Sequence, residues 1–65
     1  WLMERVTEAL RLHSYTSDMD IRVRVRDGVA ILRGRVASLQ DIDMVEDIVA
    51  EVEGVDQVQE ELTIE

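Results

Sequence analysis

The chain has 65 residues, no cysteine and a formal net charge of −8, with 15 acidic residues against 7 basic ones, all of them arginine. This length allows one small hydrophobic core, without disulfide support. The negative charge argues against a general nucleic-acid-binding domain, and no apolar run approaches the ~18 residues of a membrane-spanning helix.

The chain starts at Trp1 and not at a methionine, and it shows no signal-peptide pattern. We therefore expect residues 1–65 to form a single domain that is a fragment of a larger protein. We expect modest stability, because a domain of this size buries only about 60% of the surface that its unfolded chain exposes.

The first segment has the apolar spacing of an amphipathic helix. Residues 2–13 carry one apolar face, and this pattern predicts a helix over that range. His13 is the only histidine. No cysteine or second histidine completes a ligand set, so we interpret it as a helix-end residue and expect no metal site. Residues 14–18 predict a polar connection, because hydroxyl and carboxylate side chains compete there for backbone hydrogen bonds.

Two alternating strands follow, joined by a tight turn. Residues 21–36 contain two runs that alternate around Asp27-Gly28. Asp-Gly is favoured in a type I′ turn, which needs a positive φ at both central residues. A two-residue loop also sets the register of the hairpin, and it places Arg22 opposite Arg33.

The two faces of this hairpin differ in chemistry. The face that must be covered by other elements is apolar. It consists of Ile21, Val23, Val25, Ala30, Leu32, Gly34 and Val36. The opposite face carries five arginines: Arg22, Arg24, Arg26, Arg33 and Arg35. A glycine at the core-facing position 34 indicates either a closely packed helix or a β-bulge.

A second amphipathic helix is predicted from residue 39 to about residue 53. Its apolar stripe consists of Leu39, Ile42, Val45, Ile48, Val49 and Val52. Ser38 is a suitable N-cap with Asp41 in an imperfect capping box, and Gly54 is a suitable C-terminal stop. The outward face is acidic, with Asp41, Asp43, Glu46, Asp47, Glu51 and Glu53.

Residues 55–65 predict a third strand. Glu60 has the parity of its core-facing side, so we expect this residue near the strand end, at a bulge, or with its carboxylate in water. The strand has two open pairings, parallel to the second strand or antiparallel to the first. The apolar run at residues 29–32 favours the second strand as the centre of a mixed sheet. The pattern predicts an α+β fold, an αββαβ two-layer sandwich with both helices on one face of a three-stranded mixed sheet.

The spacing of three glycines among aliphatic residues resembles one small bacterial module. The resembling residues are Ala9-Leu10, then Ile21-x-Val23-x-Val25-x-Asp27-Gly28-Val29-x-x-Leu32-x-Gly34-x-Val36-x-Ser38, then Ile48-Val49-x-x-Val52-x-Gly54-Val55-x-x-Val58, and Leu62-x-Ile64. Over nearly its whole length the chain looks like a BON domain, named for bacterial osmotic-stress and nodulation proteins. The resemblance implies a non-enzymatic module of the periplasm or cell envelope that binds phospholipid surfaces or mediates protein contacts. Gly28, Gly34 and Gly54 are then structural glycines.

The five arginines are the leading candidates for a binding site. Arg22 opposite Arg33 is a like-charged pair that needs neutralisation. Two sources of negative charge stay open. One is internal, from Asp20, Glu61, Glu65 or water. The other is external: anionic phospholipid, or a protein partner such as another domain of the same chain or a weakly self-associating second copy. Nucleic acid is not expected, because this face lacks aromatic platforms for stacking bases.

An ion-sensing or small-ligand regulatory domain is the alternative function. Asp43, Glu46 and Asp47 offer carboxylates, but one exposed helix face lacks the backbone carbonyls that cation sites usually include. We expect no enzyme and no cofactor, because no motif places a nucleophile beside a base.

Overall fold

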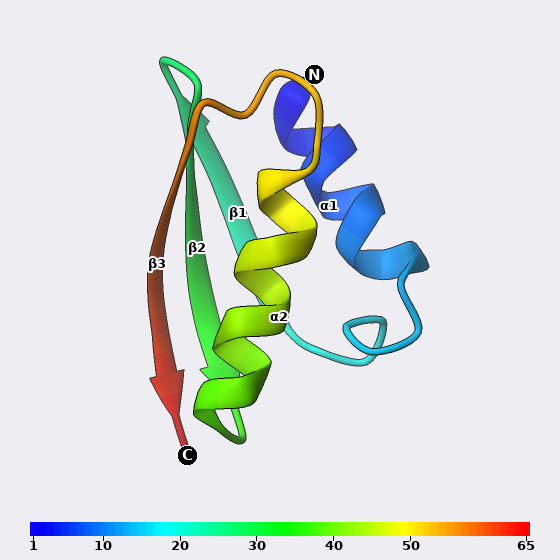
Figure 1. The fold of residues 1–65 in the computed structure, drawn as a ribbon, viewed down its shortest axis with the longest axis vertical. Coiled ribbons are helices and arrows are strands. Elements are labelled where there is room, and N and C mark those ends of the chain that lie inside the picture. The colour runs from blue at the N-terminus through cyan, green and yellow to red at the C-terminus, as the bar shows by residue number, and fades with distance from the viewer.

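The computed structural model describes residues 1–65 as two helices and three strands (Figure 1). In chain order these are α1 (Leu2–Leu12), β1 (Ile21–Arg26), β2 (Val29–Val36), α2 (Leu39–Ala50) and β3 (Gln57–Ile64). The two helices lie on the same side of the sheet in Figure 1. The predicted α+β class and the αββαβ order are confirmed.

The strand order β1-β2-β3 decides the pairing that the sequence left open. β1 and β2 are antiparallel in the predicted register, with Arg22 opposite Arg33. β3 runs parallel to β2, so β2 is central and the sheet is mixed. α2 makes this parallel pairing possible, since it returns the chain to the end of the sheet where β2 starts.

The core lies between the sheet and the helices. Its seven buried residues come from four elements: Val6, Leu10, Val23, Ala30, Leu32, Val45 and Val49. Burying these aliphatic side chains is the main stabilising contribution, at about 25 cal/mol per Å² of apolar surface. Because both helices pack on this inner face, no element covers the outer face of the sheet (Figure 1).

The structure requires glycine at position 34 for a different reason from the one predicted. Gly34 has φ +151°, and a Cβ atom there would collide with the carbonyl oxygen of Asp20 and crowd Cα of Ile21. The close approach is therefore made by the chain leading into β1, and not by a helix. At the turn, Asp27 (φ +51°) and Gly28 (φ +80°) both have positive φ, as a type I′ turn requires.

The end of α2 differs from the prediction. The helix stops at Ala50, with Glu51 as its C-cap, and does not reach residue 53. The chain then forms a tighter turn, in which the N–H of Val52 donates to the carbonyl of Val49, three residues back, at 3.1 Å. Gly54 is consequently not the helix stop. It has φ +103° and lies against the side chain of Leu2, where a Cβ would be 3.2 Å from Cδ1.

The first residue of α2 also departs from its predicted place in the core. Leu39 is 69% exposed, although it has the spacing of the buried stripe. It lies in the first turn of the helix, directly after the N-cap Ser38, whose side chain accepts a hydrogen bond from Asp41 N–H. Periodicity alone does not distinguish a covered turn from one that neighbouring elements leave open.

The segment between α1 and β1 is packed, although its composition predicts only a polar connection. Thr16 is 2% exposed, and its hydroxyl donates to the carbonyl of Leu10 near the end of α1. Met19 packs against the core. The Tyr15 hydroxyl donates to Asp41 Oδ1 at 2.7 Å and ties this segment to the start of α2. This hydrogen bond lowers the pKa of Asp41 and raises that of Tyr15.

Candidate functional site

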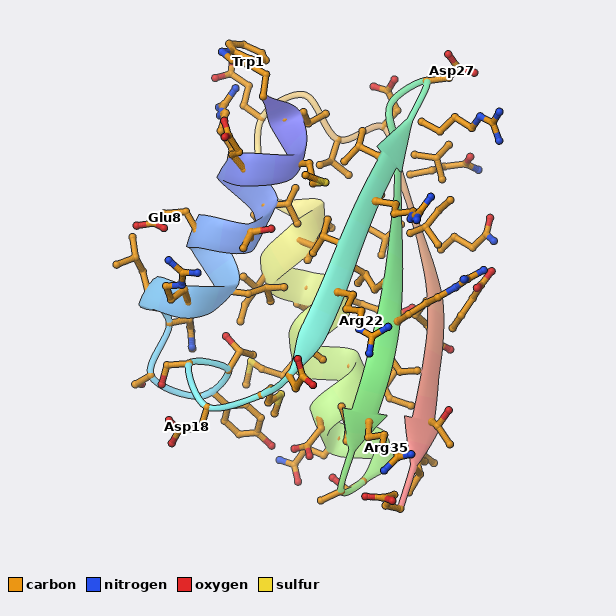
Figure 2. All side chains as sticks on the ribbon, turned by 180° about the vertical axis from the view of Figure 1, so that it is seen from behind. Trp1, Glu8, Asp18, Arg22, Asp27 and Arg35 are labelled. Atoms are coloured by element: carbon orange, nitrogen blue, oxygen red, sulfur yellow. The ribbon has the colours of Figure 1, made fainter.

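The structure brings all five predicted arginines to the uncovered face of the sheet. Side chains alternate along a strand, so residues of one parity share this face. We call this surface the arginine face. It consists of Arg22, Arg24, Arg26, Val29, Ile31, Arg33, Arg35, Gln57, Gln59, Glu61 and Thr63. In Figure 2, Arg22 and Arg35 are seen on the side of the sheet away from α1 and α2.

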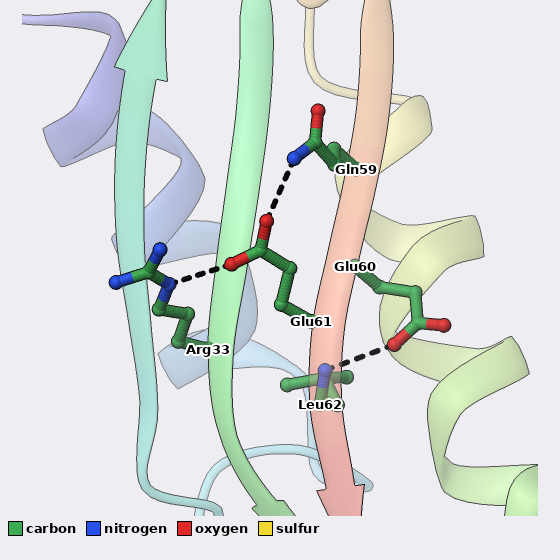
Figure 3. A network of polar contacts seen from close by, with 5 residues as sticks. All are labelled: Arg33, Gln59, Glu60, Glu61 and Leu62. Atoms are coloured by element: carbon green, nitrogen blue, oxygen red, sulfur yellow. Dashed lines mark hydrogen bonds and ion pairs between the residues drawn. The ribbon is translucent and has the colours of Figure 1, made fainter.

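Two of the arginines are neutralised within the chain. The parallel register places Arg33 opposite Glu61, and Arg33 Nε donates to Glu61 Oε1 at 2.7 Å. Gln59 Nε2 donates to the other oxygen of the same carboxylate, also at 2.7 Å (Figure 3). The hydrogen bond from Arg33 is the main reason that the pKa of Glu61 lies below its ordinary value. Arg35 pairs with Glu65 at 3.3 Å.

The three arginines of β1 have no such partner. We call Arg22, Arg24 and Arg26 the arginine row. All three are exposed, and none takes part in the five ion pairs of the structure. Of the three internal carboxylates considered, Glu61 and Glu65 form ion pairs with arginines of this face, whereas Asp20 forms none. The row therefore presents three exposed guanidinium groups without a carboxylate partner.

The surface beside Arg22 and Arg24 is hollowed. An open groove of about 580 Å³ is lined by Asp20, Arg22, Arg33, Gly34, Arg35, Glu61 and Thr63. A smaller hollow of about 100 Å³ lies between Arg22, Arg24, Ile31 and Arg33. Guanidinium groups present paired N–H donors that fit phosphate and carboxylate oxygens. The half-buried side chains of Val29 and Ile31 add apolar contact beside the row.

A comparison with protein-family models finds a match to the BON domain over residues 1–65, the whole chain. The chain belongs to the BON domain family. BON domains are generally non-enzymatic, and the proteins that carry them are generally periplasmic or envelope-associated. A comparison with curated proteins finds no match.

The arginine face of this BON domain contrasts with an acidic surface around α2. α2 contains no basic residue, and its exposed side includes Asp43 and Asp47, followed by Glu51 at the C-cap. The pKa of Glu46 is raised, first by partial burial and then by the charges of neighbouring carboxylates, among them Glu60. No group of His, Asp and Glu residues is arranged to hold a metal ion, so the ion-sensing alternative gains no support.

Glu60 occupies a position that the sequence analysis did not anticipate. It lies within β3, half-buried, and is neither at the strand end nor fully in water. Its carboxylate accepts a hydrogen bond from Leu62 N–H at 2.9 Å (Figure 3). Alternate N–H groups of β3 point to β2 or away from it, and this N–H is on the free edge. The carboxylate of Glu60 thus binds a backbone N–H on the free edge of β3, which would otherwise be available to pair with another strand.

The remaining candidates are peripheral. His13 is the C-cap of α1, and its Nδ1 accepts a hydrogen bond from Tyr15 N–H at 3.2 Å. Neither helix has the length and apolar character that crossing a membrane requires. The link from Tyr15 to Asp41 was missed because the two residues are far apart in sequence, and only the fold brings them together.

Proposed function

We propose that this BON domain is a non-catalytic docking module of an envelope protein, and that its arginine row binds anionic phospholipid headgroups. One observation carries the proposal. Three neighbouring arginines on an uncovered sheet face have no carboxylate partner, whereas the other two arginines of that face are paired. The generally non-enzymatic character of the family supports a binding role.

The geometry of the row suits a layer of headgroups. Every second residue of a strand faces the same side, so the Cα atoms of successive arginines in the row are about 6.8 Å apart. Each arginine near an anionic membrane contributes about 1 kcal/mol. Three such contributions give weak, reversible binding, which suits a module that acts together with the rest of a larger protein.

The net charge of −8 does not prevent this orientation. The acidic surface around α2 lies on the helical side, opposite the arginine face. The molecule measures 29 × 21 × 15 Å between Cα atoms, so its opposite surfaces are separated by more than the Debye length of about 8 Å at physiological salt. A membrane that contacts the row is therefore largely screened from the carboxylates behind it.

A protein partner is the second candidate for the same face. The observation that favours it is the pair of half-buried apolar side chains, Val29 and Ile31, beside the row. Interfaces between proteins commonly have an apolar centre and are enriched in arginine relative to the rest of the surface. A flat headgroup layer leaves these two side chains in a polar environment, whereas a protein surface buries them.

A vesicle-binding experiment tests the lipid proposal. Binding to vesicles of phosphatidylglycerol and phosphatidylcholine is compared with binding to phosphatidylcholine alone. Arg22→Gln/Arg24→Gln should weaken binding to the anionic vesicles by about 30-fold, at about 1 kcal/mol for each arginine. The matched control is Arg5→Gln/Arg11→Gln, which removes the same charge from α1 and should retain most of the affinity.

Two results would contradict the lipid proposal. One is equal weakening by both double variants, which would mean that net charge alone governs binding. The other is a wild-type chain that does not distinguish anionic from zwitterionic vesicles. Amide shifts in an NMR titration give a second readout, since those of β1 should move most.

A further inference from the structure

We infer that a second copy of this chain docks onto the arginine row through its acidic α2 side. The inference rests on the proposed role of the row as a docking surface, but it does not require lipid. Two complementary surfaces exist on one molecule. The row carries three unpaired cations, and α2 carries exposed carboxylates with no basic residue among them.

The spacing of the two charge sets matches. Asp43, Asp47 and Glu51 are four residues apart, so they recur about every 6 Å along the line of α2. The three arginines are two residues apart along β1 and recur about every 6.8 Å. A copy of α2 lying along β1 of another molecule would place one carboxylate beside each guanidinium, and the long arginine side chains can absorb the small mismatch.

Apolar side chains on both surfaces add to this fit. Leu39 has the same four-residue spacing as Asp43 and Asp47, and it is 69% exposed. On the other surface, Val29 and Ile31 lie beside the row. With Asp43 placed beside Arg26, Leu39 comes just beyond the end of the row, near Val29, and burying part of this leucine there is favourable.

The carboxylates around α2 also have a reason to accept cations. Glu46 is crowded by Asp43, Asp47 and Glu60, and their charges add to the effect of burial in raising its pKa. No arginine of the same molecule pairs with any of these four residues. Guanidinium groups from another copy would offset this repulsion.

The geometry sets the type of assembly. The row is on the outer face of the sheet, and α2 covers the inner face, so the contact joins different surfaces of the two copies. Such a heterologous contact leaves one row and one acidic side free at the two ends of a dimer. Further copies can add head to tail, and the assembly grows with concentration. Exposed ion pairs are individually weak, so the contact is transient.

Sedimentation equilibrium tests the inference at about 1 mM protein, a concentration that reveals weak contacts. At about 0.15 M salt the repulsion between whole molecules is screened over about 8 Å, while direct ion pairs persist. We expect the wild-type mass to exceed that of a monomer and to fall toward it at about 1 M salt. A wild-type chain that stays monomeric at the lower salt overturns the inference.

Charge-reversal variants identify the two surfaces. One variant is Arg22→Glu/Arg24→Glu/Arg26→Glu, and the other is Asp43→Arg/Asp47→Arg/Glu51→Arg. Each alone should lose self-association by at least about tenfold. Mixed in equal amounts, the two should associate, although both retain a net negative charge. Failure of the mixture to associate overturns the proposed pairing of surfaces.

A matched control separates this contact from a general charge effect. Glu4→Arg/Glu8→Arg/Asp18→Arg reverses three carboxylates away from α2 and should self-associate at least as well as the wild type. Loss of association in this control overturns the inference. If a reversal variant fails to fold, as judged by circular dichroism, the neutral sets Arg22→Gln/Arg24→Gln/Arg26→Gln and Asp43→Asn/Asp47→Asn/Glu51→Gln replace it, and each must weaken association.

The same variants distinguish this inference from the lipid proposal. The neutral α2 variant, Asp43→Asn/Asp47→Asn/Glu51→Gln, should lose self-association and still bind phosphatidylglycerol vesicles, whereas the row variants should lose both. Self-association without vesicle binding would refute the lipid proposal and leave this inference standing. Vesicle binding by a wild-type chain that stays monomeric would refute this inference and leave the lipid proposal standing.

Discussion

The two halves of the arginine face carry the same residue type in different electrostatic states. On β2, Arg33 and Arg35 are paired with Glu61 and Glu65. On β1, the arginine row has no ion pair. The difference comes from the neighbouring strand, since β3 brings acidic residues beside β2, whereas β1 is an edge strand with no such neighbour.

Strand order therefore decides which arginines are available to a partner. In the parallel register Glu61 lies directly opposite Arg33. Had β3 paired with β1 instead, its carboxylates would have been next to the row, and Arg33 would have been at an edge. A count of charges on the face is the same in both cases, yet the location of the free cations is different.

The largest effect is expected where the two strands of the hairpin meet. Gly34→Ala places a side chain at φ +151° against the backbone of Asp20, in a region of φ that side chains avoid at a cost of about 1–3 kcal/mol. Thermal unfolding should show a lower midpoint, by about 4–8 °C per kcal/mol for a domain of this size. Gln57→Ala, at an exposed position of β3 whose side chain makes no hydrogen bond, is the control and should change the midpoint little. An unchanged midpoint in Gly34→Ala would show that β1 can shift without cost.

The second-largest effect is expected from freeing one of the two paired arginines of the face. Glu61→Gln releases Arg33 from its ion pair and gives the face a fourth available guanidinium. If the row binds anionic vesicles, the affinity should rise about fivefold, the contribution of one additional arginine. Glu53→Gln removes the same charge beside Arg5 on the helical side and should raise the affinity less. Equal gains in the two variants would assign the effect to net charge.

A smaller effect is expected on the acidic side of the molecule. The folded-state pKa of Glu46 is raised, so this carboxyl favours folding below its unfolded pKa of about 4.3, and the benefit is lost as the pH rises through the folded value. Glu46→Gln should stabilise the fold at pH 7 by about 0.2–0.5 kcal/mol, as expected for removing a like-charge contact on a helix. Urea unfolding measures this, and the gain should vanish below about pH 4. A loss of stability at pH 7 would contradict it.

The smallest effect is a change in one titration. The pKa of Glu61 is lowered, so its contribution to stability is present above the unfolded pKa of about 4.3 and is lost as the pH falls through the folded value. Arg33→Gln should move the pKa of Glu61 upward in an NMR titration of the carboxyl carbon. Arg24→Gln, which removes an unpaired arginine, should leave it nearly unchanged. If both variants raised the pKa of Glu61 equally, the contrast between the paired arginines of β2 and the arginine row would be refuted.

Local patterns in the sequence were sufficient for most of the fold. The Asp27-Gly28 turn specified a type I′ hairpin and its register, because a two-residue loop leaves little backbone freedom. Alternation along the strands placed all five arginines on one face, since side-chain direction has a period of two. These features depend only on residues close in the chain. The binding role of the arginines stays a proposal.

The tertiary structure alone decided the features that depend on distant residues. The pairing of β3, which neutralises Arg33 but not Arg22, depends on the path of α2 across the sheet. The close contact at Gly34, the buried hydroxyl of Thr16 and the exposure of Leu39 each depend on which element lies alongside. Periodicity shows which side chains share a face, but the neighbour that covers or neutralises them is set only when the elements pack.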